Sequence, residues 1–299
     1  MKRNAAAAFA LAGALSTPQL LGATELAPVA DESPVFATPT TFDQVGRILV
    51  PVMINGEGPF RLIVDTGANR TTITTEVATR LGIDYVSAPT VILNGVTGSA
   101  EVPVVELTRV HAGELVLDDL QAPVVLPHLM GEADGILGVA GLREQRLFVD
   151  FRRDIVRIGR SRFERGDDLR IRAERVKGGL LGAQVRVGRV PALAVFDTGA
   201  QKTLGNRALQ AALSADDRGR QTMVYGTTEA TMTGDVAAVP DILADRVIFR
   251  DVVAAFGDFH VFDLWGLNDV PALIIGMDVL GAMDTVVIDF RLAEIRIRG

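Results

Sequence analysis

The chain has 299 residues, of which 48% are hydrophobic, and a formal net charge of −7. An acidic chain offers no general electrostatic attraction for nucleic acid, so we expect no nucleic-acid partner. It contains no cysteine, which excludes disulfides, thiol catalysis and a lipoprotein attachment site. The length allows one large core or two smaller ones.

The first 23 residues have the layout of a secretory signal peptide. Lys2 and Arg3 precede an apolar run, residues 5–15, that is too short to span a membrane and is followed by small residues. A disordered Ala-rich tail is the alternative. We expect cleavage after residue 16 or Ala23, a linker or short prosegment at residues 24–44, and a periplasmic or secreted mature protein. No other segment is long and apolar enough for a transmembrane helix, so we expect no stable membrane span after signal removal.

In the first half, short apolar runs are bounded by glycine-rich turns. Residues 47–54 and 59–64 predict a hairpin around the turn Asn55-Gly56-Glu57-Gly58. The second run leads directly into the tetrapeptide Asp65-Thr66-Gly67-Ala68. Residues 75–81 then predict a short helix that ends at Gly82. The many short β-branched segments indicate a mainly β protein.

The second half repeats this order. Residues 183–187 and 190–196 predict a hairpin that leads into a second tetrapeptide, Asp197-Thr198-Gly199-Ala200. A helix follows at 207–213, with Asn206 as its cap.

Three later landmarks also pair between the halves, after a small insertion at 260–269 in the second. They are the apolar runs 114–120 and 246–252, the apolar-Gly segments 134–138 and 272–276, and the segments 149–152 and 288–291, which lead into strands predicted at 154–158 and 293–297. With the hairpin and the helix, these make five landmarks that match in the same order around the tetrapeptides, which indicates a tandem duplication.

Between the halves, residues 161–179 are predicted to form a linker. The arginines between Arg152 and Lys177 are interleaved with acidic side chains, which is typical of a solvated surface segment. A patch that binds an anionic partner is the alternative interpretation.

Asp65 and Asp197 each stand at the end of an apolar run, at the tip of a strand that should be buried. A carboxylate there is costly to desolvate, so a chain with two of them in matching positions is expected to bring them together. Two facing carboxyls can share one proton, and one then acts as base and the other as acid towards a water molecule. A turn or helix-cap aspartate is the alternative for either one alone.

The chain resembles the aspartic proteases of the pepsin/retropepsin superfamily, specifically a single-chain bacterial protein with two retropepsin-like halves. The resemblance covers residues 45–299 and rests on the duplicated Asp-Thr-Gly-Ala segments, the glycine-rich hairpins and the downstream apolar-apolar-Gly segments. Ala68 and Ala200 resemble the retroviral type, leave room for substrate and bring no hydroxyl, whereas pepsin-like enzymes carry Ser or Thr there. Asp134-Gly135-Ile136-Leu137-Gly138 resembles the first-lobe motif of pepsins.

This resemblance implies an all-β, bilobal pseudo-twofold aspartic protease fold, with two closed-barrel-like β lobes and short helices. The lobes would be residues 45–160 and 180–299. It implies a peptidase without a cofactor, because water is the nucleophile.

The resemblance also assigns supporting roles around the two aspartates. The hydroxyls of Thr66 and Thr198 would cross the interface and bond the opposite loop, which would hold the carboxylates coplanar. Gly67 and Gly199 would let the backbone pass close to the carboxylates and point N–H groups at them.

In this family a flap hairpin closes over the catalytic pair. The candidates are residues 91–102 in the first half and 223–236 in the second. Glycine-rich tips between β-branched runs suit a mobile hairpin that adds strand-like hydrogen bonds to an extended peptide. Ordinary exposed hairpins are the alternative. The predicted tip residues are Asn94, Gly95, Val96, Thr97 and Gly98 in the first flap, and Tyr225 and Gly226 in the second.

Other candidate sites are excluded by their spacing. His111, His128 and His260 are isolated, so neither a metal site nor a Ser-His-Asp triad is expected. The chain has no Walker-type phosphate loop. Three further aspartates are predicted to be structural or turn-closing: Asp134, Asp150 and Asp289.

Three function classes follow from these patterns. The leading one is an exported endopeptidase that cleaves extended polypeptide segments with apolar side chains around the cleaved bond, and acts as a monomer. The second is a catalytically silent peptide-binding protein with the same fold. The third is a sugar-kinase or actin-like ATPase, whose fold needs long helices where this chain returns to short strands after each tetrapeptide.

Overall fold

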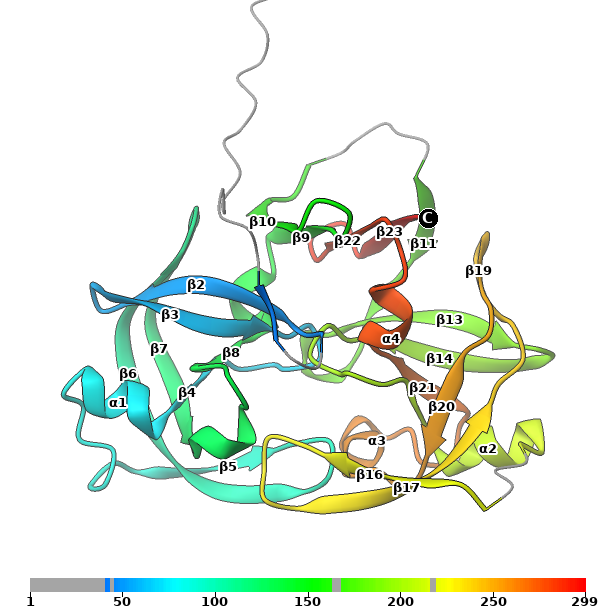
Figure 1. Cartoon of the computed structure of the whole chain (residues 1–299), viewed down its shortest axis with the longest axis horizontal. Helices are drawn as coiled ribbons and strands as arrows, with labels where there is room; N and C mark the ends of the chain where they lie inside the picture. The colour runs from blue at the N-terminus through cyan, green and yellow to red at the C-terminus, as the bar shows by residue number, and fades with distance from the viewer. Residues whose placement is uncertain (1–40, 44–45, 163–167, 216–218) are drawn as a thin grey trace, which may run out of the picture. The chain divides into compact units, whose positions relative to one another are not determined.

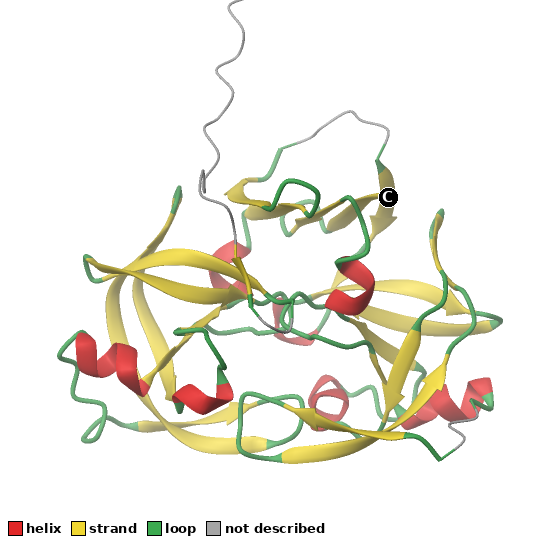
Figure 2. Cartoon of the chain, in the orientation of Figure 1, coloured by secondary structure: helices red, strands yellow, loops and turns green. Residues whose placement is uncertain are grey.

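The computed structural model describes residues 41–43, 46–162, 168–215 and 219–299, and strands dominate it (Figure 2). The predicted signal peptide, residues 1–23, and most of the predicted segment 24–44 lie outside the described residues. Within the latter segment, β1 (Thr41–Phe42) pairs antiparallel with β2 (Ile48–Ile54).

The first half forms an eight-stranded sheet, in which β2 pairs with both β3 and β6. One short helix, α1 (Thr75–Arg80), and two 3-10 turns, η1 (Pro127–Leu129) and η2 (Val139–Leu142), accompany it. In sheet order the strands are β1, β2, β3 (Glu57–Val64), β8 (Gly135–Leu137), β4 (Thr72–Thr74), β7 (Leu115–Val125), β6 (Ser99–Ala112) and β5 (Thr90–Asn94).

The second half forms a ten-stranded sheet accompanied by three short helices, α2 (Arg207–Leu213), α3 (His260–Trp265) and α4 (Met277–Leu280). In sheet order the strands are β16 (Gln221–Tyr225), β17 (Thr231–Ala238), β20 (Val253–Phe256), β15 (Leu204–Gly205), β21 (Ala272–Ile275), β14 (Val190–Phe196), β13 (Leu181–Val187), β18 (Ile242–Ala244) and β19 (Val247–Phe249), while β12 (Glu174–Arg175) pairs with β13 off this path.

The central strands of the two sheets are arranged in the same way. β3 runs parallel to β8, and β14 runs parallel to β21. In the first sheet, β4 pairs antiparallel with β8 and parallel with β7. In the second sheet, β15 pairs in the same way, antiparallel with β21 and parallel with β20. The predicted all-β fold with two β lobes and short helices is therefore confirmed.

A third sheet of five strands combines segments from both halves, at the top of the view in Figure 1. Its strands, in order, are β10 (Ile155–Arg160), β9 (Gln145–Asp150), β22 (Thr285–Asp289), β23 (Glu294–Arg298) and β11 (Leu169–Arg172). β9 of the first half pairs directly with β22 of the second, with Val149 opposite Val286. β11 comes from the segment predicted as a linker, and that segment also holds β12 and the 3-10 turn η3 (Lys177–Gly179).

Most predicted elements are present, and the differences lie at turns. Asn55 and Gly56 both have positive φ (51° and 84°), so they form a two-residue hairpin turn and β3 begins at Glu57 instead of residue 59. Asp154 and Ala293 also have positive φ (52° and 50°), so each closes a turn and the strand after it begins one residue later than predicted.

One hydrophobic core runs through all three sheets. It includes Ile48 of β2, Val185 of β13 and Ile288 of β22, each nearly inaccessible to solvent. The described residues accordingly belong to a single compact unit, Pro34–Gly299. None of the described helices has the length and apolar character needed to cross a membrane.

The predicted cap of α2 has a larger role than capping. Asn206 is buried, and its Oδ1 accepts from the N–H of Leu209 (2.9 Å) and of Ala272 (3.1 Å). Its Nδ2 donates to the carbonyls of Leu267 (2.6 Å) and Val270 (2.7 Å). Asn206 therefore also anchors the end of the inserted segment that contains α3.

Candidate active site

Two buried strands place Asp65 and Asp197 in equivalent positions. Asp65 follows β3, and its N–H donates to the carbonyl of Leu137 in β8 (3.1 Å). Asp197 follows β14, and its N–H donates to the carbonyl of Ile275 in β21 (3.0 Å). Parallel pairing in the middle of each sheet thus fixes the backbone of each aspartate.

The threonines after the aspartates hold the two loops together. Thr66 Oγ1 donates to the carbonyl of Phe196 (2.7 Å), and Thr198 Oγ1 donates to the carbonyl of Val64 (2.6 Å). Each hydroxyl also accepts the backbone N–H of the other threonine: Thr66 Oγ1 that of Thr198 (3.0 Å), and Thr198 Oγ1 that of Thr66 (3.2 Å). Both side chains are 1% exposed. These four bonds cross between the halves, and water has no access to compete for them.

The glycines of the two tetrapeptides leave the space that the carboxylates occupy. Gly67 N–H donates to Oδ1 of Asp65, and Gly199 N–H donates to Oδ1 of Asp197, both at 2.8 Å. A Cβ atom on Gly67 would overlap the carboxylate of Asp197, and one on Gly199 would overlap that of Asp65. Each carboxylate therefore lies directly against the glycine of the opposite loop.

Burial is the main influence on the protonation of the pair. It raises the pKa of Asp65 well above its ordinary value, and the neighbouring charge of Asp197 and a hydrogen bond to it raise this pKa further. Burial also raises the pKa of Asp197, but the N–H of Gly199 and the hydrogen bond from Asp65 act in the opposite direction. The pair therefore favours a state in which the two carboxyls together hold one proton.

Comparison with known proteins agrees with this geometry. A family model described as Aspartyl protease matches residues 50–140 and again residues 183–279, which together make up more than half of the chain. The chain belongs to the aspartyl protease family. DNA damage-inducible protein 1 of Kluyveromyces lactis is 28% identical over 123 residues. The match covers 40% of this chain and 28% of that relative, so the chain spans less than a third of the relative's length.

The predicted flaps of this aspartyl protease are two hairpins whose tips meet. Flap 1 is the hairpin β5–β6 with residues 94–98 at its tip, and flap 2 is the hairpin β16–β17, whose tip is residues 225–230. Thr97 Oγ1 donates to the carbonyl of Ala230 (2.7 Å). A Cβ on Gly226 would lie 2.6 Å from Thr97 Oγ1, and one on Gly95 would lie 2.9 Å from Thr227 Oγ1. Figure 1 shows the two hairpins meeting, with α3 beside them.

Two satellite clusters of apolar side chains lie next to the aspartate loops. The first-lobe cluster contacts Ala68, and the second-lobe cluster contacts Ala200. The first-lobe cluster consists of Leu49, Ile63, Val125, Met130, Ala133 and Ile136. The second-lobe cluster consists of Leu204, Val224, Ala255, Phe259, Phe262, Ala272 and Ile274.

The other predicted aspartates have structural partners. Asp134 Oδ2 accepts from the N–H of Arg61 (2.7 Å). Asp150 Oδ1 accepts from the N–H of Arg153 (3.1 Å), and Asp289 Oδ1 accepts from the N–H of Leu292 (2.9 Å). Within the described ranges, no three His, Cys, Asp or Glu side chains gather in a way that could hold a metal ion.

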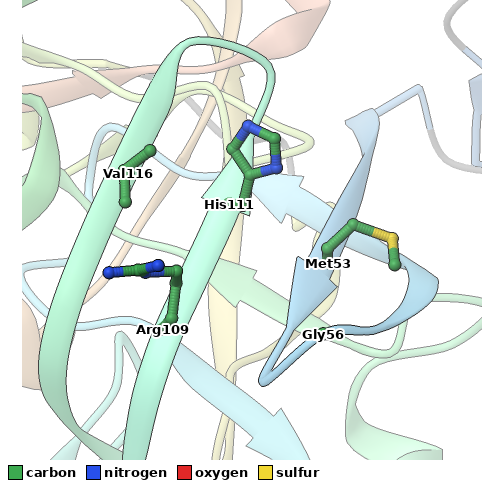
Figure 3. A pocket seen from close by; sticks show the side chains of 5 residues that line it. All are labelled: Met53, Gly56, Arg109, His111 and Val116. Carbon is green, nitrogen blue, oxygen red and sulfur yellow. The ribbon is translucent and has the colours of Figure 1, made fainter.

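A separate pocket of about 410 Å³ lies away from the aspartates (Figure 3). Its lining residues come from the end of β2 and the turn after it, and from the paired ends of β6 and β7. They are Met53, Gly56, Arg109, His111 and Val116. Neither aspartate, nor any flap tip residue, lines it.

Sequence reasoning missed the contacts of the inserted segment. Val261 N–H of α3 donates to the carbonyl of Val96 in flap 1 (3.4 Å), and His260 Nε2 lies 3.4 Å from Asn94 Oδ1. The insertion itself was visible in the sequence, as was its aromatic content. Its place against flap 1 was not, because the two segments are far apart in the chain.

We predict that the cross-linking hydroxyls are needed for stability. Thr66→Val keeps the shape of the side chain but leaves the Phe196 carbonyl and the Thr198 N–H buried without these partners. Each buried polar group without a partner costs about 1–3 kcal/mol, so the free energy of unfolding should fall by roughly 2–4 kcal/mol. Denaturant unfolding measures this loss. Thr66→Ser, which retains the hydroxyl, is the matched control, and equal stability of the two variants would contradict the assignment.

Proposed function

We propose that this chain is an exported aspartic endopeptidase that hydrolyses peptide bonds with water activated by Asp65 and Asp197. The observation that carries the proposal is the interleaving of the two Asp-Thr-Gly loops. The hydroxyls of Thr66 and Thr198 tie the loops together, and each carboxylate rests on the glycine of the other loop. Two carboxyls held this way can work as one acid–base unit.

In the proposed reaction, one carboxyl of the Asp65/Asp197 pair is ionised and the other carries the shared proton. The ionised carboxyl takes a proton from a water molecule as the water oxygen bonds to the carbonyl carbon of the substrate, and the protonated carboxyl gives its proton to the carbonyl oxygen. The product of this step is a tetrahedral diol. In its breakdown, the carboxyl that took the water proton gives it to the leaving nitrogen, the other carboxyl takes the proton of one diol hydroxyl, and the C–N bond breaks, so that the pair again holds one proton.

The surroundings of the pair favour an extended polypeptide as substrate. Apolar clusters flank the site on both sides through Ala68 and Ala200, which suits apolar side chains next to the cleaved bond. The flap hairpins offer strand edges to which a peptide can add backbone hydrogen bonds. We further propose that the protein acts as a monomer, because one chain supplies both aspartates.

The alternative of a silent peptide-binding protein is less well supported. A damaged pair or a blocked cleft would favour it, yet both aspartates are present and their N–H donors and crossing threonines are in place. The ATPase alternative has still less support, since α1 and α2, the helices that follow the two tetrapeptides, have only six and seven residues.

Replacing either aspartate should abolish proteolysis. Asp65→Asn and Asp197→Asn keep the side-chain shape but remove the ability to exchange the shared proton, so kcat should fall at least about a thousandfold in each. A casein or peptide assay measures the loss, and circular dichroism checks that the fold is retained. Turnover by either variant at the wild-type rate would rule out the proposed pair.

Activity should follow a bell-shaped pH profile with an optimum at about pH 5 to 6. Activity needs the singly protonated pair, and burial raises the pKa of both carboxyls, which moves both limbs of the bell upwards. Ala68→Ser and Ala200→Ser would add hydroxyl donors to the ionised form, so the double variant should shift the bell towards acid. The pH dependence of kcat/KM measures the shift. An unmoved bell would show that other groups set these pKa values.

We propose export on the basis of the N-terminal sequence. The proposal rests on the signal-peptide layout of Lys2 and Arg3 followed by the apolar run at residues 5–15. The mature chain should begin after residue 16 or Ala23. Mass spectrometry of the N-terminus after cell fractionation tests this. Intact Met1 on protein from the cytoplasmic fraction would contradict it.

A further inference from the structure

We propose that the inserted helix α3 is a docking platform that positions flap 1 across the catalytic pair, so that the two flaps are not equivalent. This inference rests on the proposed function, because positioning a flap matters only if substrate binds beneath it. It gives a role to the insertion that interrupts the match between the two halves.

Flap 1 contacts the apolar clusters of both lobes. Leu93 packs against the first-lobe cluster, which also contacts Ala68. Val96, three residues later, packs against the second-lobe cluster, which also contacts Ala200. A hairpin that reaches the neighbours of both aspartate loops within three residues must pass across the junction between them.

Apart from the tip of flap 2, flap 1 contacts the second lobe through α3 and the residue before it. Val96 lies against a cluster that contains Phe259 and Phe262, and Val261 of α3 contacts the same cluster. The carbonyl of Val96 accepts the N–H of Val261 (3.4 Å), which is a donor at the start of a helix and has no intrahelical partner. The tip of flap 1 is therefore held by apolar packing and by a backbone hydrogen bond.

Flap 2 has no such support from the opposite lobe. Its Val224 and Met232 pack against the cluster of their own lobe. Among the described residues, none of flap 2 belongs to or packs against the first-lobe cluster. The first-lobe segment at the place of α3 is only the short turn η1, whose Leu129 contacts its own cluster. Where flap 2 does contact the first lobe, it contacts the tip of flap 1.

The tips differ in sequence as this arrangement requires. Thr228 follows Asp197 by as many residues as Val96 follows Asp65, so the two are counterparts. Val96 is apolar and sits in an apolar cluster, whereas Thr228 carries a buried hydroxyl for which no hydrogen-bond partner is found among the described residues. Flap 1 is thus built to stay docked, and flap 2 is the hairpin that moves to admit substrate.

A pair of matched variants tests the role of Val96 in turnover. Val96→Ser should lower kcat/KM about tenfold by raising KM, because docking of flap 1 loses its apolar contact. The limbs of the pH profile should not move, because the aspartate pair is untouched. Val86→Ser, the same change at an exposed valine outside both flaps, is the matched control and should stay within about twofold of wild type. Equal effects of the two variants, or a loss in kcat alone, would overturn the proposal.

Spin labelling gives a readout that needs no catalysis. The chain has no cysteine, so labels attach only at introduced ones. One pair joins flap 1 to the second lobe (Ile92→Cys with Ala211→Cys), and another joins flap 2 to the first lobe (Met223→Cys with Glu76→Cys); all four sites are exposed. Without substrate, the first pair should give a narrow distance distribution and the second a broad one. Adding Val96→Ser should broaden the first.

The two readouts separate the possible failures. Equally narrow distributions for both flaps, or a first distribution unchanged by Val96→Ser, would overturn the docking of flap 1 even if the protein is a protease. Wild-type protein no more active than Asp65→Asn would instead contradict the proposed function, while the distance measurement would still report on α3.

Discussion

The hydrogen bonds between Thr66 and Thr198 are the constraint on which the rest of the site depends. Each hydroxyl reaches across to a backbone carbonyl of the other half, and each accepts a backbone N–H from the other loop. Because both threonines are buried, neither loop can move without leaving polar groups unpaired. The position of either carboxylate is therefore set by both halves together, and an isolated half could not reproduce it.

Bringing the two carboxyls together, as the proposed chemistry requires, has a cost in stability. Two carboxyls are brought together in a buried site, and their pKa values are raised above those of the unfolded chain. Below the unfolded pKa both carboxyls are protonated in either state, so their contribution to stability is fully present. As the pH rises through the folded pKa values, the buried pair must ionise and that stability is lost. The hydrogen bonds of the crossing threonines and the strand pairing of the shared five-stranded sheet hold the two halves together and offset this loss of stability.

The two aspartate loops are symmetric, whereas the two flap hairpins are not. The loops that carry the aspartates match almost atom for atom in their bonding, with equal Gly67 and Gly199 distances to the carboxylates. The hairpins do not match, because only the second half has the longer segment that forms α3 and contacts Val96. A single chain permits such a difference, since its two halves can change independently. An extended peptide has a direction, so a site with inequivalent flaps can be better suited to it than a symmetric one.

The sequence alone determined the parts of this protein that local patterns encode. Apolar runs before Asp65 and Asp197 predicted the buried strands, and Asn206 predicted the start of α2, because strand alternation and capping act over a few residues. The crossing of the threonines followed only from the family resemblance. Tertiary structure alone decided that β11 of the supposed linker joins the third sheet, that the carboxylates rest on each other's glycines, and that Val96 docks beside α3. These contacts join residues far apart in the chain, and no local pattern specifies which distant surfaces will meet.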